Sequence, residues 1–90
     1  MNKLRRKHIG ELSERIQEAQ ATLEELLSEL EQLRDDEREA FENIPESMEG
    51  SERYQNAEAA ADALDEAYDT LEESASNLED VIGSLETAVE

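Results

Sequence analysis

The 90-residue chain contains no cysteine and no tryptophan, and it has only one phenylalanine, two tyrosines, one proline and three glycines. The absence of cysteine excludes disulfides and thiolate metal sites. Because the sequence has no long apolar run, it predicts neither a membrane-spanning helix nor a secretory signal segment, and we expect a cytoplasmic protein. So few aromatic residues in so short a chain favour long helices with a narrow apolar seam over a globular core.

Positive charge is also scarce, since 8 lysines and arginines face 26 aspartates and glutamates and give a formal net charge of -18. The main basic cluster, Lys3, Arg5, Arg6 and Lys7, lies in the N-terminal end, residues 1–8. This distribution excludes direct binding of nucleic acid, which requires basic side chains along its phosphates. Low hydropathy and high charge also fit intrinsic disorder, but the apolar periodicity argues against it.

Apolar residues recur at alternating steps of three and four residues in both halves of the chain. In the first half, ten of eleven such positions are apolar: Ile9, Leu12, Ile16, Ala19, Leu23, Leu26, Leu30, Leu33, Glu37 (the exception), Ala40 and Ile44. In the second half, all eleven are apolar: Tyr54, Ala57, Ala61, Leu64, Tyr68, Leu71, Ala75, Leu78, Ile82, Leu85 and Val89. Such a repeat predicts two helices of a left-handed coiled coil.

The two periodic halves are separated by the segment NIPESMEGS. Pro45 disfavours helical geometry at Ile44, Gly50 supplies flexibility, and Ser51 is a good N-cap for the next helix. We therefore expect one all-α domain, residues 1–90, that folds as an antiparallel two-helix coiled-coil hairpin. Its helices should span about 3–43 and 52–88, joined by a turn at 44–51.

A hairpin that turns near residue 49 places position i roughly opposite position 98 minus i, so that Leu23 faces Ala75, Ala19 faces Leu78 and Ile9 faces Val89. The same pairing lays the basic N-terminal end beside Glu86 and Glu90, at the negative end of the second helix dipole. The seam that should hold the hairpin or its dimer together contains Ile16, Leu23, Leu26, Leu30, Leu33, Leu64, Tyr68, Leu71, Leu78, Ile82 and Leu85.

Further apolar residues widen this seam, namely Ala60, Ala67, Val81 and Ala88 in the second half and Leu27 and Phe41 in the first. Because one partner helix does not cover so wide a face, we predict a homodimer that forms a four-helix bundle. A monomer with a loosely covered alanine-rich face is the alternative. The orientation of the two hairpins stays open, as does the role of Ile44, Met48 and Tyr54 as a recognition tip or as an apolar cap of the bundle.

No catalytic, cofactor or metal site is predicted, and we expect a non-enzymatic protein. His8 is the single histidine, so neither a catalytic serine nor a transition-metal site has the partner that it needs. The pairs Glu11 with Glu14 and Glu66 with Asp69 have the spacing that all-α nucleotide pyrophosphatases use to hold Mg²⁺. With 26 acidic residues in 90, however, this spacing is expected by chance.

The second half contains no lysine or arginine from Tyr54 to the end, whereas ordinary soluble helices mix both signs. Glu58, Asp65, Glu72, Glu79 and Glu86 recur every seven residues beside the seam, and Asp62, Glu66, Asp69, Glu73 and Asp80 broaden this line. We predict that this acidic face mimics nucleic acid and occupies a basic groove of a nucleic-acid-binding partner. The alternative is a purely structural coiled-coil dimerisation protein whose acidity serves solubility.

The turn resembles that of small acidic helical-hairpin proteins from phages and other mobile elements of bacteria. The residues that carry this resemblance are Asn43, Pro45, Glu46, Ser47, Ser51, Glu52 and Arg53. The resemblance implies a small accessory protein without known catalytic residues, and no activity is carried over from it. It favours an inhibitor that mimics nucleic acid, since small acidic decoys recur in mobile elements. Similarity to secreted helical hairpins of the WXG type is poorer, because the W-x-G turn is missing.

Overall fold

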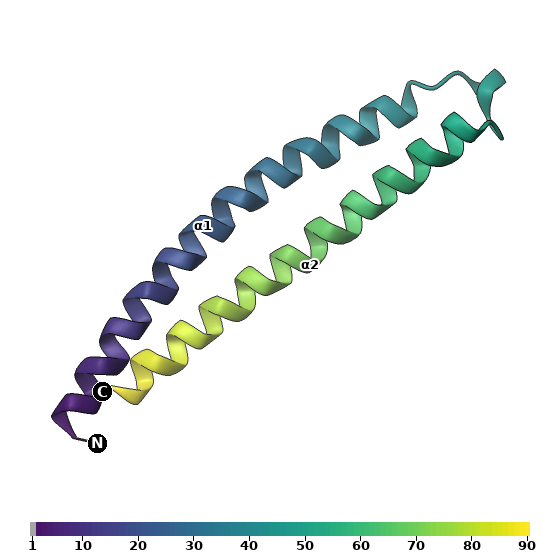
Figure 1. Cartoon of the computed structure of the whole chain (residues 1–90). Helices are drawn as coiled ribbons and strands as arrows, with labels where there is room; N and C mark the ends of the chain where they lie inside the picture. The colour runs from purple at the N-terminus through teal and green to yellow at the C-terminus, as the bar shows by residue number, and fades with distance from the viewer. Residues whose placement is uncertain (1) are drawn as a thin grey trace.

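The computed structural model describes residues 2–90 as a long, thin hairpin of two helices. Helix α1 (Lys3–Glu42) is followed by the short 3-10 helix η1 (Glu46–Met48) and by helix α2 (Glu52–Ala88). The two long helices run antiparallel, both termini lie at the same end (Figure 1), and the molecule extends over 69 × 16 × 15 Å. The predicted all-α hairpin is confirmed, with helix ends within one residue of the expected positions.

The ends of both helices are set by local side-chain and backbone chemistry. Asn2 caps α1, since its side chain accepts a hydrogen bond from the backbone N–H of Arg5 at 2.7 Å. Ser51 caps α2 in the same way through the N–H of Tyr54 at 3.1 Å, as the sequence predicts. Before it, Gly50 has a φ of 83°, in the left-handed region that favours glycine. The turn is therefore encoded by a few residues that lie next to one another in the chain.

Helix α2 contacts α1 through the positions that its apolar spacing predicts. Ala61, Ala75 and Ile82 are buried, with exposed fractions of 0%, 7% and 8%. The other eight positions of the predicted line are half-buried: Tyr54, Ala57, Leu64, Tyr68, Leu71, Leu78, Leu85 and Val89. No large side chain in residues 2–90 is fully buried, so this core is a single thin layer.

Helix α1 is rotated relative to the predicted spacing. Six of the eleven positions predicted for the first half are half-buried: Ile9, Ile16, Leu23, Leu30, Glu37 and, just beyond the helix, Ile44. The other five are exposed, with Leu12 and Leu26 at 46% and Leu33 at 58%, and with Ala19 and Ala40 also exposed. Their places are taken by the next residue along the chain: Ser13, Gln20, Leu27, Arg34 and Phe41. Leu26 and Leu33 thus lie outside the seam within the single hairpin, and their expected place in a seam of the dimer stays a prediction.

The physical reason for this rotation is that α1 offers two competing lines on either side of its central apolar line. One partner helix covers the central line and one of its neighbours, but not both. In the observed rotation of α1, the ring of Phe41 packs against that of Tyr54, at 5.0 Å between centroids. The guanidinium of Arg34 lies 4.3 Å from the ring centroid of Tyr68. These aromatic contacts are gained while the leucines of the second line are left outside.

The pairing of the helices follows the predicted register. Gln20 donates a hydrogen bond from Nε2 to the carbonyl oxygen of Ala75 at 3.3 Å, and Arg38 contacts Asp62 at 3.4 Å. Each partner lies within about one helical turn of position 98 minus i. Leu23, Ile9 and Val89 are half-buried as their predicted pairings require, but Ala19 is exposed and Gln20 replaces it.

Candidate protein-interaction surface

The ten acidic residues that the sequence singles out form one surface on α2, which we call the acidic flank. It consists of Glu58, Asp62, Asp65, Glu66, Asp69, Glu72, Glu73, Glu79, Asp80 and Glu86. Nine of them are exposed, and Asp65 is half-buried. Because a heptad position follows the axis of a coiled coil, Glu58, Asp65, Glu72, Glu79 and Glu86 run along the hairpin directly beside its seam.

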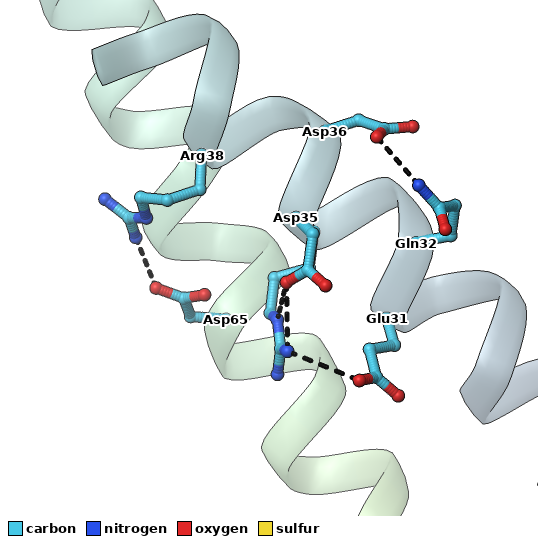
Figure 2. A network of polar contacts seen from close by, with 7 residues as sticks. Glu31, Gln32, Asp35, Asp36, Arg38 and Asp65 are labelled. Atoms are coloured by element: carbon cyan, nitrogen blue, oxygen red, sulfur yellow. Dashed lines mark hydrogen bonds and ion pairs between the residues drawn. The ribbon is translucent and has the colours of Figure 1, made fainter.

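Arginines of α1 reach the same side of the hairpin. Arg38 pairs with Asp65 and, at 3.4 Å, with Asp62, so one guanidinium bridges the two helices (Figure 2). Arg34 forms its ion pairs within α1, with Asp35 at 3.1 Å and Glu31 at 4.0 Å. Its guanidinium also lies over the ring of Tyr68. The acidic flank is therefore partly neutralised near the turn by arginine of α1, while α2 itself has no lysine or arginine after Arg53.

The pKa values of two arginines and two tyrosines in this region are raised, mainly by hydrogen bonds for the arginines and by desolvation for the tyrosines. The hydrogen bond with Asp65 raises the pKa of Arg38, and the hydrogen bond with Asp35 raises that of Arg34. Desolvation, followed by the negative charges of Glu31 and Glu72, raises the pKa of Tyr68. Desolvation, followed by Glu49 and Glu58, raises the pKa of Tyr54. Since Glu31 is on α1 and Glu72 on α2, carboxylates of both helices act on the same face of the seam.

The cross-helix ion pairs of Arg38 were not predicted from the sequence. The available signal is that Arg38 directly follows Glu37, a contact position of α1, just as Asp65 directly follows Leu64 in α2. In an antiparallel pair such positions lie on the same side. Glu37 itself is half-buried, and no ion pair joins it to Arg34 or Arg38 within residues 2–90.

The basic N-terminal end lies near the end of α2, as predicted (Figure 1). Its four cations, Lys3, Arg5, Arg6 and Lys7, are exposed. In the part of the chain that the structure describes, none of them forms an ion pair with Glu86 or Glu90. Their side chains are thus available to a partner outside the hairpin.

The other residues that were considered as possible catalytic or metal-binding groups lie scattered over the surface. His8 is exposed, and so are Glu11, Glu14, Glu66 and Asp69. Across residues 2–90, no three histidine or carboxylate side chains come together in a way that would hold a metal ion. None of the helices in the same range is long and apolar enough to cross a membrane.

At the turn, Ile44, Met48 and Tyr54 are half-buried, and the ring of Tyr54 packs against that of Phe41 at a tilt of 49°. The choice between a recognition tip and an apolar cap stays open.

The fold and surface define an acidic antiparallel helical hairpin. Comparisons of the chain with protein-family models, with curated proteins and with solved structures found no significant match. The resemblance of the turn to proteins of mobile elements stays a prediction.

Proposed function

We propose that the chain is a non-catalytic binding protein whose acidic flank mimics nucleic acid and occupies a basic groove of a DNA- or RNA-handling protein. The observation that carries this proposal is that nine of the ten carboxylates of the acidic flank are exposed side by side on a helix that has no cation after Arg53. An inhibitor from a phage or mobile element, acting in the cytoplasm of its host, is the biological form that the turn resemblance suggests.

Electrostatics supports this function. Carboxylates three and four residues apart on a helix lie about 5–6 Å from each other, a spacing comparable to that of backbone phosphates. The self-repulsion of such a surface is a cost to the hairpin, and its field attracts and orients cationic partners. A homodimer would carry twice -18, or -36, on a rod about as long as a short duplex.

The proposal includes association of two hairpins into a four-helix bundle. The thin core and the exposed Leu12, Leu26 and Leu33 support it, because a second hairpin would cover side chains that the first leaves in water. The same observation favours the second candidate function, a structural dimerisation protein in which acidity only keeps the rod soluble.

A matched pair of variants distinguishes the two functions. In the first variant, Glu58, Glu72, Glu79 and Glu86 become glutamine and Asp65 becomes asparagine. In the control, five exposed carboxylates on the outer side of α1 become glutamine, namely Glu11, Glu18, Glu25, Glu29 and Glu39. Both variants change the net charge by the same amount and leave the apolar residues of the seam in place; the first also removes the carboxylate that pairs with Arg38, so circular dichroism verifies that it is folded.

The immobilised proteins are used to capture partners from bacterial lysate, with elution by rising salt and by duplex DNA. The nucleic-acid mimic requires a partner that duplex DNA displaces, that the control retains and that the first variant loses. If both variants retain the partner equally, or if the partner resists salt and DNA, the acidic flank is not the binding surface.

A further inference from the structure

The hairpin has a second continuous surface, which we call the apolar flank. It consists of the exposed apolar residues that directly precede contact positions: Leu12, Ala19, Leu26, Leu33 and Ala40 on α1, and Ala60, Ala67, Val81 and Ala88 on α2. Val81 is 42% exposed, close to the 46% of Leu12 and Leu26. On each helix these residues recur at intervals of seven, interrupted only by Ser74 on α2.

Both halves of the apolar flank lie on the same side of the hairpin. Arg38 and Asp65 each follow a contact position, and their ion pair fixes one side of the seam as the acidic one. Residues that precede contact positions project from the opposite side of each helix. A shallow hollow on that side joins the two helices; it is lined by Leu30 of α1 and by Ala63, Ala67, Thr70, Leu71 and Ser74 of α2, with Glu66 at its border with the acidic flank. The rod is thus acidic on one face and apolar on the opposite face.

We propose that a second copy of the chain covers the apolar flank in the reversed orientation, with its turn beside the termini of the first copy. This inference deepens the homodimer part of the proposed function. It leaves both acidic flanks on the outside of the bundle, on opposite faces. The binding of a basic partner does not depend on it.

Charge complementarity along the rod selects the orientation. The end with the termini carries the exposed cations Lys3, Arg5, Arg6 and Lys7 beside Glu86 and Glu90, whereas the turn end carries Glu39, Glu42, Glu46, Glu49 and Glu52 with Arg53 as a nearby cation. The rod is 69 Å long, many times the Debye length of about 8 Å at physiological salt, so only neighbouring charges interact. The reversed orientation brings cations next to acids at both ends. In the same-way orientation, both turns lie at the same end of the bundle. Two basic clusters would then meet at one end and two acidic turns at the other.

The reversed orientation assigns a specific neighbour to each residue of the apolar flank. A two-fold axis across the middle of the rod stacks α1 on the partner's α1 and α2 on the partner's α2. With the axis midway between Ala19 and Leu26, Leu26 lies against the partner's Ala19, and Leu12 lies against the partner's Leu33. On α2, Ala67 then lies near the partner's Val81, and Ser74 lies near the partner's Ser74.

The same-way orientation also pairs large with small residues, but it stacks α1 on the partner's α2. There, Ser74 lies near the partner's Leu26 instead of the partner's Ser74. The position of Ser74 therefore distinguishes the two orientations.

Because the chain contains no cysteine, a single introduced cysteine can form a disulfide only with the same cysteine of the partner copy. Cross-linking therefore shows that the two positions lie next to each other in the dimer. We expect Ser74→Cys to form a disulfide-linked dimer under mild oxidation, since facing helices bring such Cα atoms within the 4.4–6.8 Å that a disulfide requires. Ser76→Cys is the matched control. Ser76 is equally exposed, but it lies on the other side of the buried Ala75, so it should remain unlinked.

A second pair of thiols tests the ends. Ala60→Cys and Ala88→Cys should each remain unlinked alone and should cross-link when the two variants are mixed. Linking of Leu26→Cys to Ser74→Cys, with no self-linking of Ser74→Cys, would overturn the reversed orientation in favour of the same-way one.

Analytical ultracentrifugation tests whether the apolar flank is covered at all. Replacement of Leu26 and Leu33 by glutamine should give a monomer, whereas Leu4→Gln, at a side chain 77% exposed and outside the flank, should leave the dimer intact. Circular dichroism verifies that both variants are helical. A wild-type protein that sediments as a monomer would overturn this inference, and partner capture by the acidic flank would then be tested independently with the charge variants.

Discussion

The rotation of α1 makes a sharp prediction for two neighbouring leucines. Leu27 is half-buried in the seam, whereas Leu26 beside it is 46% exposed on the apolar flank. Replacing either residue by alanine removes the same atoms from the same helix and changes helix propensity equally. Any difference in the free energy of unfolding therefore reports which leucine contacts α2.

For Leu27→Ala we expect a loss of about 2 kcal/mol, at the lower end of the range for buried leucines, because the site is half-buried and solvent fills the space. In a domain of this size that loss lowers Tm by roughly 8–16 °C. For Leu26→Ala at low protein concentration, where single hairpins prevail, we expect a change within about 0.5 kcal/mol.

Thermal unfolding followed by circular dichroism, repeated over a wide range of protein concentration, measures both effects. At high concentration Leu26→Ala should also lose stability, since dimer formation contributes to Tm there. Equal losses for the two variants at low concentration would refute the rotation, and a larger loss for Leu26→Ala would restore the simple alternation that the sequence suggests.

Two further predictions concern the turn and the tyrosines. Gly50→Ala should destabilise the hairpin by about 1–2 kcal/mol in urea unfolding, because φ is 83° there and a Cβ is strained in that region; Gly83→Ala, in a helix and with open space around it, should not destabilise. The raised pKa values of Tyr54 and Tyr68 mean that folding favours the neutral phenols. Their stabilisation is complete below the ordinary pKa of 10.0 and is lost as pH rises through the folded values. Tm should therefore fall in this alkaline range, and absorbance of the phenolates should show a midpoint above that of the urea-unfolded chain; equal midpoints would contradict the effect.

The helices, the turn and the contact face of α2 were predictable because each depends on local residues or on a single unambiguous apolar line. Pro45, Gly50 and Ser51 act within a few residues of the chain. In α1 the prediction followed the more apolar of two neighbouring lines. It failed because the choice between them depends on contacts with α2, such as those of Phe41 with Tyr54 and Arg34 with Tyr68.

The candidate surface, like the fold, was predictable from the sequence only in part. The position of the acidic flank follows from the seven-residue recurrence of carboxylates along α2. The contact of Arg38 with Asp62 and Asp65 does not, since it depends on the rotation of α1 about its own axis. Charge patterns within one helix were thus accessible from the sequence, and contacts between helices were not.

The common location of the two termini has a mechanical consequence (Figure 1). If the protein is attached at that end, for example to a fusion partner or a bead, its turn can project up to about 69 Å into solution. In a single hairpin both long faces then remain open to approach from the side along their whole length, and its own chain ends do not obstruct its turn. Pulling on the two ends would instead peel α1 from α2 one layer at a time, starting at Ile9 and Val89.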